Sequence, residues 1–157
     1  VSSCLYENGV LSGSIPETNF GDFPVGYTGG GAGLVSTLGD YGRFANELLR
    51  CYRGGEGILS RENAVMMGTP QLDEETIPGV YDFFNWGFGV RAMRVRREWQ
   101  PLPAGSYGWS GAYGTHFWVD PVNGVTAVYM HNSGTFGGAG APHTLAFERA
   151  VTEDLSL

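Results

Sequence analysis

The part of this 157-residue chain that most constrains its fold is a run of short apolar segments between residues 86 and 131. In the first segment, Trp86, Phe88 and Val90 alternate with small or polar residues, which is the period of a β-strand. Three more candidate strands cover residues 106–112, 114–120 and 125–131. Pro121-Val-Asn-Gly124 between the last two is a tight-turn sequence, so it predicts an antiparallel hairpin.

The candidate strands carry apolar side chains on both of their faces. Phe117 and Val119 mark one side of their strand, while His116 and Trp118 leave the opposite side far from polar. A sheet with this pattern needs cover on both faces. We therefore predict an antiparallel sheet with helices packed against it.

Helical patterns precede and follow these strands. Thr37 can cap a first helix, Ser60 a second over residues 61–67, and Pro142 suits the first turn of a terminal helix. The predicted buried face of the first helix consists of Tyr41, Phe44, Leu48 and Leu49. That of the terminal helix consists of Phe147, Ala150, Val151 and Leu155. The predicted fold class is α+β, an antiparallel sheet with flanking helices.

These elements fit one domain that spans residues 1–157. Its predicted regions are an irregular arm (1–28), a helical region (29–70), antiparallel strands (86–131) and a terminal helix (142–155). The hydrophobic share of 42% and charged share of 16% indicate a globular chain rather than a disordered one.

Charge and composition exclude some classes of function. The formal net charge of −7 argues against general nucleic-acid binding, which needs a basic surface. No apolar run approaches the roughly 18 residues of a membrane span, and no signal-peptide pattern opens the chain. Cys4 and Cys51 do not define a disulfide framework, and we expect two ordinary thiols. The compartment, bacterial cytoplasm or periplasm, stays open.

Two glycine-containing motifs carry a family resemblance. The run Gly29-Gly-Gly-Ala-Gly-Leu-Val-Ser-Thr37 leads into a helix that contains Asp40-Tyr41, and Trp109-Ser-Gly111 follows on a candidate strand. In this order and spacing, the chain resembles the carboxy-terminal portion of the serine β-lactamase-like hydrolases, which include class C β-lactamases, esterases and D-Ala-D-Ala carboxypeptidases. The resemblance implies an incomplete β-lactamase/transpeptidase-like fold.

The resemblance also implies roles for four residues. Trp109, Ser110 and Gly111 match the triplet on the strand that edges the family's active site, so they would line the acyl pocket. Gly111 would let a substrate lie close to the strand, and the N–H group of Ala112 would be one donor of an oxyanion hole. The complete protein would transfer acyl groups of an ester, a β-lactam or a D-amino-acid peptide.

The chain nevertheless contains no lysine, because all nine of its basic residues are arginines. The family's Ser-x-x-Lys nucleophile and base therefore cannot lie in it, and arginine stays protonated and cannot act as the base. We expect no catalytic residue in this chain, no cofactor, and a need for the family's missing amino-terminal portion or self-association as partner. The alternative is a non-catalytic binding or scaffold module that reuses half of the hydrolase fold.

Other residue groups have simpler interpretations. His116, His131 and His143 lack the short spacing of a zinc site, so we predict core or surface histidines and no metal. A cluster of four arginines could hold a substrate carboxylate, but we predict that it forms a solvated hairpin tip. The cluster consists of Arg91, Arg94, Arg96 and Arg97. Tyr6-Glu7-Asn8 matches the family's Tyr-x-Asn pattern, but its sequence context favours a structural role.

Overall fold

The computed structural model describes residues 3–8, 10–15, 31, 34–73, 83–133, 138 and 140–157. Within these residues, two antiparallel sheets and three helices form an α+β fold, as predicted. In the described part of the chain, none of the helices is long and apolar enough to span a membrane.

The amino-terminal arm is more regular than predicted. β1 (Ser3–Glu7) and β2 (Val10–Ile15) pair antiparallel as a hairpin. Asn8 in its turn has a φ of 51°, a left-handed conformation that asparagine tolerates better than most residues. The prediction of an irregular arm is therefore wrong for residues 3–8 and 10–15, because the two segments pair as strands. The rest of the arm lies outside the described residues.

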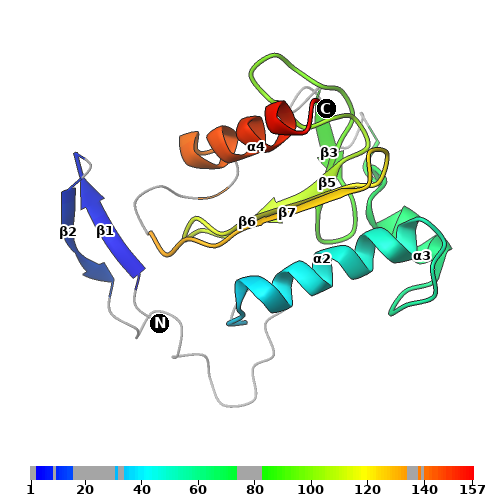
Figure 1. Ribbon diagram of the computed structural model, residues 1–157, viewed down its shortest axis with the longest axis horizontal. Coiled ribbons are helices and arrows are strands. Elements are labelled where there is room, and N and C mark those ends of the chain that lie inside the picture. The colour runs from blue at the N-terminus through cyan, green and yellow to red at the C-terminus, as the bar shows by residue number, and fades with distance from the viewer. Residues whose placement is uncertain are drawn as a thin grey trace.

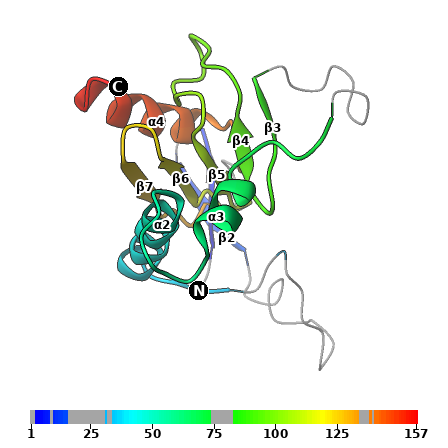
Figure 2. The same cartoon turned by 90° about the vertical axis from the view of Figure 1, so that its right-hand side faces the viewer.

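The main sheet has five antiparallel strands in sequence order (Figures 1 and 2). They are β3 (Phe84–Trp86), β4 (Arg91–Met93), β5 (Tyr107–Ser110), β6 (His116–Asp120) and β7 (Val125–Tyr129). The predicted strand over 86–90 is wrong. The Gly87 N–H donates to the carbonyl of Val90 at 2.9 Å, and Gly89 has a φ of 73°, so these residues form the turn of a hairpin.

The hairpin of β6 and β7 is confirmed. Asp120 pairs with Val125, and the four residues between them form the turn. The Asp120 carboxylate accepts from the N–H groups of Val122 (2.9 Å) and Asn123 (3.0 Å). Gly124 follows with a φ of 78°, a conformation that favours glycine. The turn therefore sets the register of both strands.

Helix α2 (Leu38–Tyr52) begins where the sequence predicts. The Thr37 hydroxyl accepts from the Asp40 N–H at 3.1 Å and donates to the Asp40 carboxylate at 2.9 Å. Side-chain capping of this kind satisfies a free amide of the first turn. The buried residues of α2 are Ala45, Leu48 and Cys51, and Cys51 is a free thiol. Phe44, which we predicted to be buried, is 38% exposed.

The short helix α3 (Arg61–Met67) is also confirmed. The Ser60 hydroxyl accepts from the Asn63 N–H at 3.2 Å, which is the predicted N-cap. Its last turn packs against the sheet, because a side chain at Gly68 would collide with the ring of Tyr107.

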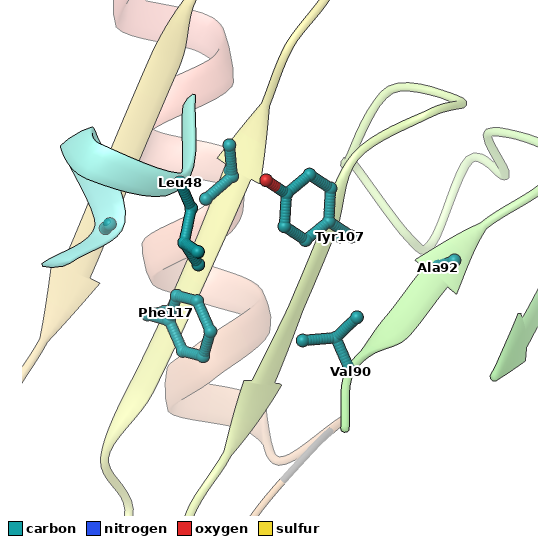
Figure 3. Packing of buried hydrophobic residues seen from close by; sticks show 7 residues of the cluster. Leu48, Val90, Ala92, Tyr107 and Phe117 are labelled. Carbon is teal, nitrogen blue, oxygen red and sulfur yellow. The ribbon is translucent and has the colours of Figure 1, made fainter. Parts of the chain in front are cut away.

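The five-stranded sheet lies between two layers of helix. α4 (Pro142–Asp154) covers one face and α2 the other (Figures 1 and 2). On the α2 face, one core cluster includes Leu48, Val90, Ala92, Tyr107 and Phe117 (Figure 3). The core on the α4 face consists of Phe84, Met93, Leu102, Trp118 and Ala127. The prediction of a sheet covered on both faces is confirmed.

The buried face of α4 differs from the predicted one. Its buried residues are Thr144, Glu148 and Thr152, while Ala150 and Leu155 are exposed. Phe147 and Val151 are half-buried against the core. The predicted buried face contained only apolar residues, because hydrophobic periodicity cannot identify a polar side chain that is buried together with a hydrogen-bonding or charged partner. The partner of Glu148 lies on the sheet.

Candidate functional site

The site predicted from the sequence lies at the end of β5, where β5 continues beyond the residues that pair with β4. β4 pairs with β5 only through Arg91 opposite Gly108 and Ala92 opposite Tyr107. Trp109 and Ser110 pair with β6 on the other side, so among the described residues their β4-side edge has no strand partner. An open edge presents unpaired backbone groups to an extended ligand.

The backbone directions at this edge can be derived from the adjacent turn. The Gly111 N–H donates to the carbonyl of Thr115, on the β6 side, at 2.8 Å. Successive N–H groups of a strand point to opposite edges, so the N–H of Ser110 faces the open edge. Ala112 is exposed, and its N–H donates to no acceptor among the described residues. Two donors are thus available near this edge.

Trp109 is a surface residue, not a core tryptophan. It is 38% exposed, whereas Tyr107, Gly108 and Ser110 of the same strand are buried. Its ring lies 4.7 Å from that of Trp86, at an interplanar angle of 58°. The pair provides an aromatic surface next to the open edge.

The turn after β5 itself explains why position 111 is a glycine. A Cβ atom there would collide with Oγ1 of Thr115, and the Gly114 N–H closes the turn onto the Gly111 carbonyl at 3.1 Å. The prediction that this glycine serves close approach of a substrate stays a prediction, because the turn alone already favours glycine.

Ser110 faces the opposite side of the sheet from Trp109, beneath α4. It is 5% exposed, and its Oγ lies 2.7 Å from Nδ1 of His116, its cross-strand partner. Any contact between Ser110 and a substrate at the open edge therefore involves its backbone rather than its hydroxyl.

His116 continues this contact toward α4. Its Nε2 lies 3.0 Å from Oε1 of Glu148, an ion-pair distance, although the contact lacks the angle of a hydrogen bond. Both side chains are almost completely buried. The order Ser110–His116–Glu148 is that of a nucleophile, a base and an orienting acid, but Ser110 is only 5% exposed, whereas a nucleophile must be accessible to its substrate.

Two further side chains hold the Glu148 carboxylate. Arg91 Nη2 lies 3.3 Å from Oε1, and Gln100 Nε2 donates to Oε2 at 2.9 Å. The side-chain oxygen Oε1 of Gln100 accepts in turn from the Leu102 N–H at 2.8 Å. Burial lowers the pKa of Arg91, and the charge of Glu148 counteracts that shift. A buried carboxylate needs such compensation.

Sequence reasoning missed this buried network. Arg91 is 5% exposed, so the prediction of a solvated tip is wrong for it, while Arg94, Arg96 and Arg97 are exposed as predicted. A glutamate at a core-facing position of the last helix, four residues after Thr144 and four before Thr152, was the available signal. This signal can be interpreted only when the strands that face Glu148, β4 and β6, are known.

The other two histidines lie near the turn after β5. The rings of His131 and His143 are 5.5 Å apart, and a Cβ atom at Gly114 would approach a nitrogen of each. Burial, the largest effect, lowers the pKa of His143, and a hydrogen bond with the Gly114 backbone partly offsets this shift. Among the described residues, no group of three or more His, Cys, Asp or Glu side chains could hold a metal ion.

The structure describes one further sequence motif and part of another. Tyr6 lies on β1 and Asn8 in its turn, so Tyr6-Glu7-Asn8 belongs to a hairpin. Of the glycine run at 29–33, only Gly31 is among the described residues.

Comparison with known proteins identifies the family and agrees with the fold. The family model described as Beta-lactamase matches residues 7–150. Two curated Mycobacterium tuberculosis proteins, "Uncharacterized protein MT1414" (strain CDC 1551 / Oshkosh) and "Protein Rv1367c" (strain ATCC 25618 / H37Rv), are each 31% identical over 123 residues. The match covers 68% of this chain but only 29% of each relative.

Proposed function

Because this chain belongs to the beta-lactamase family, we propose that it forms one wall of the active-site cleft of a serine hydrolase and has no acyl-transfer activity alone. The observation that carries the proposal is the open edge of β5 at Trp109–Ala112, with the exposed Trp109 ring beside it. This edge combines backbone donors with an aromatic surface, the two features that an acyl-binding site needs.

The proposed substrate is an ester, a β-lactam or a D-amino-acid peptide. Its acyl part would lie along the β5 edge against Trp109, and the N–H of Ala112 would stabilise the oxyanion of the tetrahedral intermediate. The nucleophilic serine and the lysine base come from residues outside this chain, since it contains no lysine.

The direct test measures hydrolysis of p-nitrophenyl esters and nitrocefin by the purified 157-residue chain. We expect no saturable turnover. A Ser110→Ala variant assayed in parallel tests whether any activity comes from this serine, because its hydroxyl oxygen lies 2.7 Å from Nδ1 of His116. Saturable turnover by the unchanged chain would overturn the proposal.

A second test concerns the complete protein. The coding sequence upstream of Val1 should contain Ser-x-x-Lys, and a polypeptide that includes it should hydrolyse one of the three substrate classes. In that polypeptide, Trp109→Ala should raise KM, since it removes aromatic surface from the acyl site. The absence of Ser-x-x-Lys upstream would favour the non-catalytic binding or scaffold module instead.

A further inference from the structure

We propose that His116 is a positioning residue, which acts through Ser110 to fix the backbone of Trp109–Ala112, and that Glu148 holds His116 in a single tautomer. The inference rests on the proposed function, because that backbone is the part of β5 assigned above to the substrate. The evidence lies in the buried contacts that join this strand to α4 and β4.

The contacts form an unbroken path from α4 to the substrate edge. Glu148 is fixed by Arg91 (3.3 Å) and Gln100 (2.9 Å), and it lies 3.0 Å from His116. His116 is bonded to Ser110 at 2.7 Å. The residue directly after β5 is Gly111, which begins the turn that presents the N–H of Ala112.

The charge of Glu148 selects the tautomer of His116. A proton on Nε2 faces the carboxylate and is attracted by it, whereas a bare Nε2 would place its lone pair against that negative charge. With the proton on Nε2, Nδ1 is an acceptor, so the Ser110 hydroxyl donates to it. This arrangement gives the serine hydroxyl one orientation and holds its strand against β6.

Burial explains why these side chains position the backbone of β5, and why Ser110 does not act as a second nucleophile. Ser110, His116 and Glu148 are exposed by only 5%, 3% and 1%. A carbonyl carbon cannot approach the Ser110 oxygen between the sheet and α4 without displacing the helix. The hydrogen bonds of Ser110 with His116 and of Gln100 with Glu148 restrain these buried side chains. The end of β5 has no β4 partner that could restrain it instead.

The first measurement leaves the sequence unchanged. Long-range ¹H–¹⁵N correlation spectra of the histidine side chains report which ring nitrogen carries the proton. We expect His116 to be the Nε2–H tautomer at pH 7, and Glu148→Gln to broaden or mix its signals. A predominant Nδ1–H tautomer in the unchanged chain would overturn the inference.

The second measurement follows hydrogen exchange of the Gly111 amide. We expect Ser110→Ala and His116→Ala to accelerate it by about twofold to tenfold, the equivalent of one hydrogen bond. His116→Gln should restore much of the protection, because its carbonyl can accept from Ser110 while its amide donates to Glu148.

Ser106→Ala is the matched control. Ser106 is a fully buried serine just before β5, and its Oγ has no hydrogen-bond partner among the described residues. We expect this variant to leave Gly111 exchange unchanged. Equal acceleration in the control, or acceleration spread evenly over α2 and β7, would show a general loss of stability and would overturn the positioning role.

The two proposals fail in distinguishable ways. If the tautomer and the local exchange are as expected but the complete protein hydrolyses nothing, the proposed function fails while the role of His116 in fixing the strand stands. If the complete protein is active, His116→Ala should lower kcat with little change in KM, and His116→Gln should recover activity. Unchanged kcat in His116→Ala would overturn the inference.

Discussion

At the scale of single residues, Gly108 sets how closely two central strands approach. A Cβ atom there would collide with the backbone carbonyl of Phe117, on the neighbouring strand, and lie 2.7 Å from Cα of Trp118. Backbone atoms of a central strand cannot move aside as a flexible side chain can. Gly108 also marks the last residue of β5 that pairs with β4, so this close contact borders the open edge.

We expect Gly108→Ala to lower the free energy of unfolding by about 1–3 kcal/mol, because overpacking forces the strands apart. Urea denaturation monitored by tryptophan fluorescence measures the change. Gly42→Ala is the control: Gly42 lies inside α2 with open space around it, so alanine should raise stability by up to about 1 kcal/mol. Equal effects at both positions would contradict the steric argument.

Tyr107 provides a pH prediction at the same scale. Its ring is buried beside Leu48, and burial, with smaller effects of Tyr52 and Cys51, raises the pKa of its hydroxyl (Figure 3). The unfolded state therefore releases this proton first, near the ordinary tyrosine value of about 10. The stabilising contribution is complete below that pH and is lost as pH rises above it.

Tyr107→Phe should therefore reduce the loss of stability above about pH 10. At pH 7 it should change the free energy of unfolding by less than about 1 kcal/mol, since the hydroxyl has no hydrogen-bond partner among the described residues. Chemical denaturation from pH 7 to 11 tests both statements, with Tyr113→Phe as a variant outside the two hydrophobic clusters. An unchanged alkaline profile in Tyr107→Phe would contradict the assignment.

At the scale of elements, local signals predicted the helix starts and the β6–β7 hairpin well. Thr37, Ser60 and the turn at 121–124 act on their own backbone, so their effect can be read from a few neighbouring residues. The turn at 87–90 was missed because its alternating apolar residues imitate a strand. The polar buried face of α4 was missed because its partners are on β4 and β6, far away in the sequence.

The cap of α2 can be tested directly. We expect Thr37→Ala to cost about 1 kcal/mol of stability, because it leaves an amide of the first turn without its acceptor. Thr37→Ser should retain most of the stability, since its hydroxyl can accept the same bond. Thermal unfolding followed by circular dichroism compares the two; equal melting temperatures in Thr37→Ala and the unchanged chain would exclude a stabilising cap.

At the scale of the whole molecule, apolar side chains are exposed at the start of α2. Leu34, Val35 and Leu38 are 100%, 79% and 57% exposed. The chain spans only 29% of the length of its curated relatives, so in a longer protein this surface could meet the remainder. On its own, exposed apolar surface favours association.

We predict that the isolated chain self-associates at high concentration through this surface. Sedimentation velocity should show a concentration-dependent increase in mass, and Leu34→Ser combined with Val35→Ser should reduce it. Val122→Ser is the control, because Val122 is 68% exposed but lies in the β6–β7 turn. A stable monomer of the unchanged chain at high concentration would contradict the prediction.

The sequence by itself determined the fold class, the family, the helix starts, the β6–β7 hairpin and the absence of the Ser-x-x-Lys pair, because caps, turns and motifs are local. Only the tertiary structure decided which face each site residue occupies. It turned Ser110 inward and Trp109 outward, left the edge of β5 open, and brought His116 and Glu148 together. These outcomes depend on strand register and helix packing, which join residues that are distant in the sequence.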